Sequence, residues 1–165
     1  MKHLAAGLAL VALAAPPLAA KSGDTGDLDA VFDTLDRRLF DIGFNTCNLD
    51  ESASLVAEDL EFYHDQGGVT HGRDAFIATM EQNICNGRQT VRRERVDGSF
   101  RLEPLYENGT LYGVIQFGSH RFLIVDDTGH AEPTGLAEFA HLWLLTDDGA
   151  WELSRVLSYA HRPPE

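Results

Sequence analysis

Basic side chains are scarce in this chain of 165 residues, in which 13 lysines and arginines stand against 26 aspartates and glutamates. A surface with this balance repels phosphate backbones, so we expect no nucleic-acid partner. Beyond residue 15 the chain also lacks any apolar run long enough to span a bilayer as a helix. We therefore expect no stable association with a membrane once the N-terminal segment has been removed.

The first twenty residues have the layout of a secretory signal peptide. A basic start with Lys2 and His3 precedes an apolar run, a Pro16-Pro17 break and small residues. The run of about 12 residues is too short for a permanent transmembrane helix, although an uncleaved anchor is the alternative. We expect cleavage near residue 20, a flexible leader over residues 21–27, and a periplasmic or secreted protein. Without residues 1–20, 12 basic and 26 acidic side chains remain, a net charge of −14.

Cysteine is equally scarce, with only Cys47 and Cys85. In an oxidising compartment an even pair can form a disulfide, whereas two buried free thiols are the alternative. The sequence leaves this open because it does not give the distance between the two Cα atoms. Although His64, Asp65 and His71 lie close together, they match no HExxH-type or paired-cysteine spacing. We therefore expect no metal ion and no other cofactor.

The hydrophobic period changes once along the chain. Residues 28–45, 47–59 and 73–85 carry apolar residues at helical spacing, and "LEFYH", residues 60–64, is predicted to be a strand. From residue 91 onward, strand patterns alternate with turns that contain Asp or Asn followed by Gly. This order predicts one α+β domain over residues 28–162. About three N-terminal helices would pack on one face of a strongly curved antiparallel sheet.

Three segments carry a resemblance to a known superfamily: "FNTCN", "EDLEFYHDQGGVTHGRDAF" and "FAHLWLLTDDGAWELSRVLSYAH". Over residues 28–161 the chain resembles the NTF2-like superfamily and, more narrowly, its DUF4440/SnoaL-like branch. The resemblance implies a cone with a mostly apolar pocket between helices and sheet, and a homodimer formed through the convex face of the sheet. The superfamily contains isomerases, dehydratases and cyclases as well as members that only bind a molecule, so the fold does not select an activity.

His64 and His141 are the candidate catalytic residues. Strand alternation places His64 at the end of an inward row, and places His141 on one face with Phe139 and Trp143. The resemblance puts both where ketosteroid isomerases carry functional aspartates. A neutral imidazole can accept a proton, and a second one can donate a hydrogen bond to developing charge. The simpler hypothesis is that both recognise a polar group of a bound ligand.

Further polar residues complete the predicted pocket. Arg155 and Tyr159 share one face of the last strand, unless a bulge turns Ser154 and Ser158 inward instead. Arg155 would grip a carboxylate ligand or pair with a buried acid. The arginines of "GRQTVRRERVDGSFR" predict either a solvated edge paired with acids or an anion-attracting rim. The predicted pocket residues are Tyr63, His64, Asp65, His120, His141, Arg155 and Tyr159.

Together these features predict an exported domain that binds a small organic molecule in an apolar pocket edged by histidines. One alternative is an enzyme of the isomerase, dehydratase or cyclase type that uses His64 as a proton shuttle. The other is a dimeric interaction module whose sheet face recruits a partner protein. The sequence does not name the ligand.

Overall fold

The computed structural model describes residues 25–164. The predicted signal peptide and the predicted leader up to residue 24 lie outside the described residues. The first helix begins at Thr25, two residues before the expected end of the leader, a difference within the usual variation of helix boundaries. Over the described residues, no helix is both long enough and apolar enough to cross a membrane.

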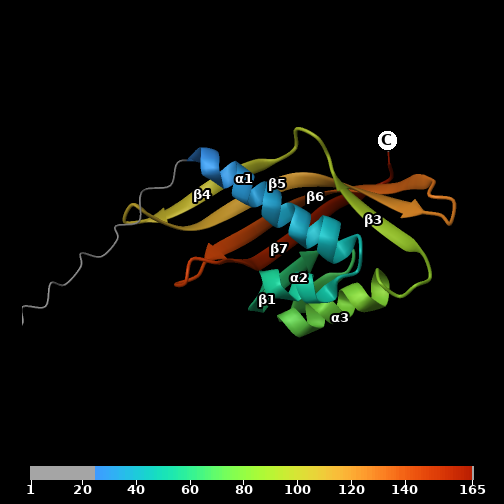
Figure 1. Cartoon of the computed structure of the whole chain (residues 1–165), viewed down its shortest axis with the longest axis horizontal. Helices are drawn as coiled ribbons and strands as arrows, with labels where there is room; N and C mark the ends of the chain where they lie inside the picture. Colours follow the sequence, from blue (N-terminus) through green and yellow to red (C-terminus); the bar gives the residue numbers. More distant parts are fainter. Residues whose placement is uncertain (1–24, 165) are drawn as a thin grey trace, which may run out of the picture.

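The apolar stripe predicted over residues 28–45 forms one rod, α1 (Thr25–Asp36) continued by the π-helical segment η1 (Arg37–Phe44). The rod ends on a wide π turn, in which Asn45 N–H donates to the carbonyl oxygen of Phe40, five residues back. A Cβ atom at Gly43 would collide with Ser52 Oγ, so glycine lets α2 (Leu49–Leu55) pack closely against the rod. The third helix, α3 (Arg73–Asn83), lies beside α2 (Figure 1).

All strands of the described residues belong to one seven-stranded sheet. The order is β2-β1-β7-β6-β5-β3, and β4 pairs with a further part of the long strand β5. The strands are β1 (Val56–His64), β2 (Gly68–His71), β3 (Thr90–Arg95), β4 (Arg101–Glu107), β5 (Thr110–Val125), β6 (Ala131–Leu145) and β7 (Trp151–Arg162).

The predicted α+β class is confirmed, with two corrections of detail. The sheet is mixed and not purely antiparallel, because β1 runs parallel to β7, a pairing that the long chain between them permits. The second helix, predicted to reach residue 59, ends at Leu55. Val56 already pairs with Leu153 of β7, and this sheet pairing overrides the local helical pattern.

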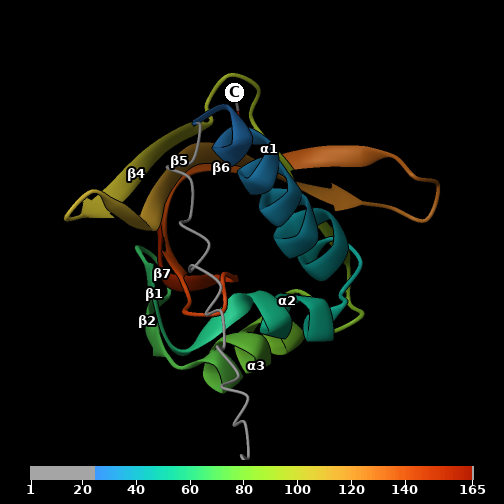
Figure 2. The same ribbon diagram turned by 60° about the vertical axis from the view of Figure 1, so that its left-hand side comes forward.

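The predicted turns connect consecutive strands of the second half. The β4–β5 hairpin turns at Asn108 and Gly109, whose φ values of 51° and 82° fit the tight turn that matches the twist of a hairpin. Inside, Phe32 of α1 packs edge-on against Trp143 and Trp151, with ring centroids 6.0 Å and 5.1 Å apart. Figure 2 shows the result: a curled sheet, with α1 lying across it in the upper part of the view and α2 and α3 in the lower part.

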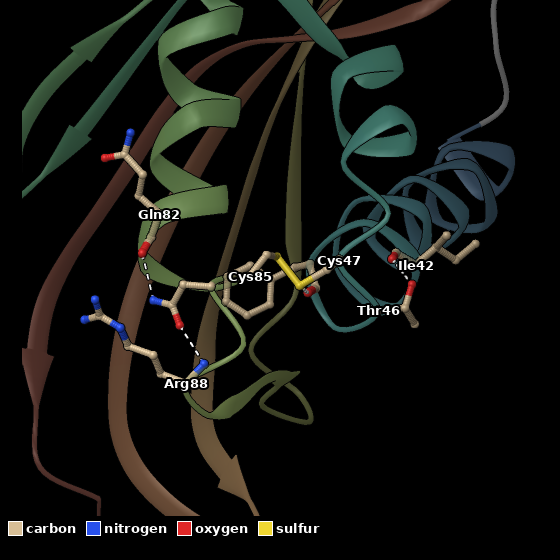
Figure 3. Close-up of a disulfide and its surroundings, with 8 residues drawn as sticks. Ile42, Thr46, Cys47, Gln82, Cys85 and Arg88 are labelled. Atoms are coloured by element: carbon tan, nitrogen blue, oxygen red, sulfur yellow. Dashed lines mark hydrogen bonds between the residues drawn. A yellow bond between two sulfur atoms is a disulfide. The ribbon is translucent and has the colours of Figure 1, made fainter.

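Cys47 and Cys85 form a disulfide, with their Cα atoms 5.7 Å apart. It links the loop after η1 to the residues that follow α3 (Figure 3). By loop-closure entropy, a bridge across 38 residues stabilises the fold by about 4 kcal/mol. Such a bond is typical of an oxidising compartment, which agrees with a location outside the cytoplasm.

Candidate functional site

A cavity of about 580 Å³ lies between the sheet and the helices. Its walls come from η1, α3 and five strands, and they are mostly aromatic and aliphatic. Among the residues that line it, none is an aspartate, glutamate, lysine or arginine. The largest apolar side chains of the wall are Leu39, Phe40, Phe44, Phe62, Phe76, Met80, Ile84, Phe122 and Leu153.

Three of the predicted pocket residues, His64, His120 and His141, line this cavity. They come from β1, β5 and β6. His120 and His141 are 3% and 2% exposed, and their ring centroids are 6.4 Å apart. The ring of Phe139 packs against both, with its centroid 4.4 Å from each imidazole centroid. Two buried histidines therefore share one part of the wall.

The other four predicted residues lie away from the cavity wall. Tyr63 and Tyr159 are each 40% exposed. Arg155 pairs with Glu61 at 3.3 Å, so its charge is matched at the surface. Asp65 turns toward His161, at the rim. The predicted grip of Arg155 on a carboxylate ligand is therefore not possible in this arrangement.

A bulge in β7 explains the positions of Arg155 and Tyr159. The β6–β7 register shifts by one residue, since Trp143 faces Leu153 while Leu142 faces Arg155. Ser154 is the extra residue, so the side chains from Arg155 to Tyr159 change face. Ser158 consequently lines the cavity, which is the alternative that the sequence had left open.

His64 is held in one tautomer by the loop that follows it. Its Nδ1 atom accepts backbone N–H groups from Gln66 (3.1 Å) and Gly67 (3.0 Å), so the proton of the neutral ring resides on Nε2. Partial burial, and in second place the neighbouring His161, lower the pKa of His64, which keeps the ring neutral at pH 7. His64 therefore offers an N–H donor, which argues against its use as the base of a proton shuttle.

His120 is fixed by a buried arginine. Arg93 Nε donates to His120 Nδ1 at 2.8 Å, and an arginine is only a donor, so the His120 proton lies on Nε2. The guanidinium also donates to both oxygens of Asp36, at 2.8 Å and 3.0 Å. Burial and the charge of Arg93 hold the pKa of His120 well below its usual value. His120 is a neutral donor.

His141 has the opposite tautomer. Gln116 Oε1 accepts the indole N–H of Trp143 at 2.8 Å, and its amide nitrogen faces Asp36 at 3.4 Å, which fixes the orientation of the amide. His141 Nδ1 lies 3.4 Å from the same oxygen and must therefore donate, which leaves Nε2 as an acceptor. Burial, with a contribution from Arg93, lowers the pKa of His141 to about 3.

One acidic residue connects both histidines. Asp36, 5% exposed, reaches His120 through Arg93 and His141 through Gln116. Sequence reasoning placed Arg93 on a solvated edge or an anion-attracting rim, but it is 1% exposed and its guanidinium stacks on Phe40 at 3.7 Å. The wall thus presents a neutral hydrogen-bond donor and a neutral acceptor, and the charges behind them are compensated.

A second polar group lies at the rim, where the side-chain ligand atoms of His64, Asp65 and His161 come within 4.8 Å of one another. The two imidazole rings are stacked 4.3 Å apart at an angle of 21°. Imidazoles bind an ion in the ring plane, and two nearly parallel planes do not meet at one ion. His64 Nδ1 is moreover occupied by backbone donors. This geometry does not favour a metal site.

No protein-family model matches the chain, and no curated protein matches it in sequence. Solved structures do match. An NTF2-like superfamily protein from Salmonella enterica has 14% identity over 86% of this chain and 94% of its own, with a TM-score of 0.62. ActVI-ORFA from Streptomyces coelicolor has 17% identity, coverage of 82% and 97%, and a TM-score of 0.65.

An uncharacterised protein with a cystatin-like fold from Caulobacter vibrioides has 15% identity over 84% of this chain and 92% of its own, with a TM-score of 0.63. These similarities define the class as an α+β fold in which helices and a curled sheet enclose a cavity. The chain has the NTF2-like fold. At such identities the comparisons carry no activity from one protein to another.

Proposed function

We propose that this protein binds a small organic molecule in the cavity and that it does so outside the cytoplasm. The observation that carries the proposal is the pair of buried histidines with opposite tautomers in a mainly apolar wall that holds no acidic residue, lysine or arginine. A volume of about 580 Å³ lies in the range of pockets that enclose small ligands. The disulfide and the predicted signal peptide support the compartment.

The wall chemistry indicates the ligand class. Five phenylalanines from four elements, η1, β1, α3 and β5, favour a flat apolar or aromatic body. A hydroxyl group satisfies both histidines at once, because it accepts from His120 Nε2–H and donates to His141 Nε2. An ionised ligand would need a counter-charge, and Arg93 is already neutralised by Asp36. The proposed ligand is therefore a neutral, mainly aromatic alcohol or phenol.

The test is calorimetric titration with 2-naphthol, naphthalene and 2-naphthoate. Each hydrogen bond contributes roughly 0.5–1.5 kcal/mol, so 2-naphthol should bind about tenfold tighter than naphthalene, and 2-naphthoate more weakly than 2-naphthol. His141→Leu should remove the preference of the protein for 2-naphthol over naphthalene. His130→Leu is the matched control, because His130 is 69% exposed in the β5–β6 turn.

Two results would contradict the proposal. If none of the three compounds binds, the cavity is not a site for aromatic molecules of this size. If naphthalene binds as tightly as 2-naphthol, the histidine pair does not recognise a hydroxyl group. Native mass spectrometry of protein purified from its own host, in which a co-purifying mass identifies the ligand class, is an independent measurement.

Many proteins with the NTF2-like fold are dimers. We propose that this chain also forms a homodimer, through the outer face of its sheet. Tyr63, Leu157 and Tyr159 lie there, each at least 40% exposed, and Tyr63 is the register partner of Leu157. Neighbouring apolar side chains of this size on one sheet face favour burial against a second copy. We also propose that the chain belongs to the DUF4440/SnoaL-like branch, on the segments that resemble it, among them "EDLEFYHDQGGVTHGRDAF".

A further inference from the structure

A hydrogen-bonded chain of Ser158, His161 and Asp65 lies at the rim of the cavity. Ser158 Oγ is 3.4 Å from His161 Nε2, and His161 Nδ1 is 2.5 Å from Asp65 Oδ1. The backbone N–H of His161 also donates to Asp65 Oδ2 at 3.2 Å, which holds the carboxylate in place. This group could not be predicted from the sequence pattern, because Asp65 and His161 are 96 residues apart.

Two irregularities of the backbone assemble the group. The bulge at Ser154 turns Ser158 toward the cavity, where it is 8% exposed. Ala160 then has a φ of 54°, a left-handed conformation that non-glycine residues rarely adopt, and it turns His161 back toward Ser158. Backbone strain of this kind is typical of functional sites. Asp65 is brought alongside by its own N–H, which donates to the carbonyl oxygen of Ser158 at 3.1 Å.

The direction of the hydrogen bonds follows from the carboxylate. Asp65 only accepts, so His161 Nδ1 carries the proton and Nε2 has the free lone pair. That lone pair faces the hydroxyl group of Ser158, and the hydroxyl faces the cavity. A serine, a histidine base and an orienting carboxylate in this order form an arrangement that activates a serine for attack on a carbonyl group.

A donor for the resulting oxyanion lies next to the serine. His64 is the register partner of Ser158 on the neighbouring parallel strand, and both line the cavity. The two backbone N–H groups on His64 Nδ1 leave its Nε2–H free to donate. Its ring stacks on His161 at 4.3 Å, so the donor and the base are held as one unit. A fixed donor of this kind stabilises charge that develops during acyl transfer.

We propose that Ser158 is the nucleophile of an esterase activity toward small apolar carboxylic esters, with His161 as base and Asp65 as its positioning residue. Ser158 Oγ attacks the ester carbonyl carbon while its proton moves to His161 Nε2. The bond from that carbon to the alkoxy oxygen then breaks, and His161 returns the proton to the departing alcohol. Water releases the acyl group by the same steps and restores Ser158. The inference rests on the proposed function only in that the cavity holds the substrate.

The decisive experiment is labelling of the exported, disulfide-bonded protein with a small alkyl fluorophosphonate, followed by peptide mapping. The expected result is one adduct per chain on Ser158, together with hydrolysis of 4-nitrophenyl butyrate. Ser158→Ala should abolish both, and His161→Gln should lower both rates by about 100-fold or more. Ser54→Ala and His130→Gln are the matched controls, because both residues are exposed and neither lines the cavity, and they should change neither rate.

Asp65→Asn separates positioning from a structural role. It should slow labelling by about tenfold or more and move the pH–rate profile to lower pH, because the protonated imidazole loses its carboxylate partner. A purely structural change would lower the yield of folded protein without moving the profile of the folded fraction. An unchanged profile would overturn the role of Asp65.

If no adduct forms, or if it forms on a residue other than Ser158, the assignment of Ser158 as the nucleophile is wrong. If His161→Gln is labelled as fast as the wild type, the assignment of His161 as the base is wrong. The adduct is mapped on wild-type peptides, so the test of the nucleophile does not require that the Ser158 variant folds. Titration with 2-naphthol distinguishes the two proposals: binding without labelling leaves only the binding function, whereas labelling without naphthol binding leaves only the esterase.

Discussion

The buried pair of Asp36 and Arg93 allows a sharp prediction about stability. Asp36 is 5% exposed and accepts two hydrogen bonds from a guanidinium that is 1% exposed. Asp36→Asn keeps the shape of the side chain, but it removes the negative charge and directs an NH₂ group at donors of Arg93 or Gln116. Arg93 would remain buried, charged and short of acceptors.

The cost follows from the desolvation of that unpaired charge. Breaking a buried ion pair by removing one partner typically destabilises a protein by about 3–5 kcal/mol. For a domain of this size that corresponds to a fall in Tm of roughly 10–20 °C. The matched control is Asp33→Asn, because Asp33 is on the same helix and pairs with Arg95 at 2.7 Å, but is 54% exposed. An exposed pair contributes about 1 kcal/mol or less.

Urea unfolding followed by circular dichroism at pH 7 measures both variants on one scale. We expect the midpoint of Asp36→Asn to fall far below that of Asp33→Asn, with similar m-values. Equal midpoints would refute the reasoning, since the two positions differ chiefly in burial. A second variant, Asp36→Leu with Arg93→Met, should recover most of the loss, because an apolar replacement of a buried ion pair is often neutral or stabilising.

Three further predictions concern the bridge, the histidines and the outer face. Reduction of the Cys47–Cys85 disulfide should lower the free energy of unfolding by about 4 kcal/mol in urea titrations, and an unchanged midpoint would contradict the loop-closure account. His141 has a pKa of about 3 when folded and about 6.5 when unfolded, so its contribution to stability is complete above pH 6.5 and is lost as pH falls toward 3. Unfolding free energies should therefore drop by about 1.4 kcal/mol per pH unit below pH 6, and His141→Gln, but not His130→Gln, should reduce that slope. On the outer face, Leu157→Asp should convert the proposed dimer to a monomer in sedimentation experiments, whereas Ile42→Asp, at a similarly exposed apolar residue of η1, should not.

The fold could be predicted because hydrophobic periodicity and turn-forming residues are local properties of the sequence. Alternation of Phe139, His141 and Trp143 along β6 placed all three on one face, and all are at most 2% exposed. Turn residues such as Asn108 and Gly109 marked the hairpins through their own backbone preferences. The parallel pairing of β1 with β7 could not be predicted in this way, because it depends on where two distant segments meet.

The failures in the site have an equally physical reason. Beyond Leu153, the apolar residues Val156 and Leu157 are neighbours in β7 and therefore point to opposite faces of the sheet. The sequence pattern thus did not reveal which face is inward. A single extra residue at Ser154 decided it, and moved Arg155 and Tyr159 outward. Arg93 was missed because its burial depends on Asp36, which is 57 residues away in the sequence.

The buried network itself argues that the cavity has a function. Asp36, Arg93 and Gln116 contribute little net stability that well-packed apolar side chains would not also supply. What they do provide is orientation, since Arg93 fixes the proton of His120 on Nε2 and Gln116 fixes that of His141 on Nδ1. The apolar double variant should therefore remain folded and yet lose its preference for 2-naphthol over naphthalene. If that preference survives the replacement, the network is only a feature of the core, and recognition of a hydroxyl group must be sought elsewhere in the cavity.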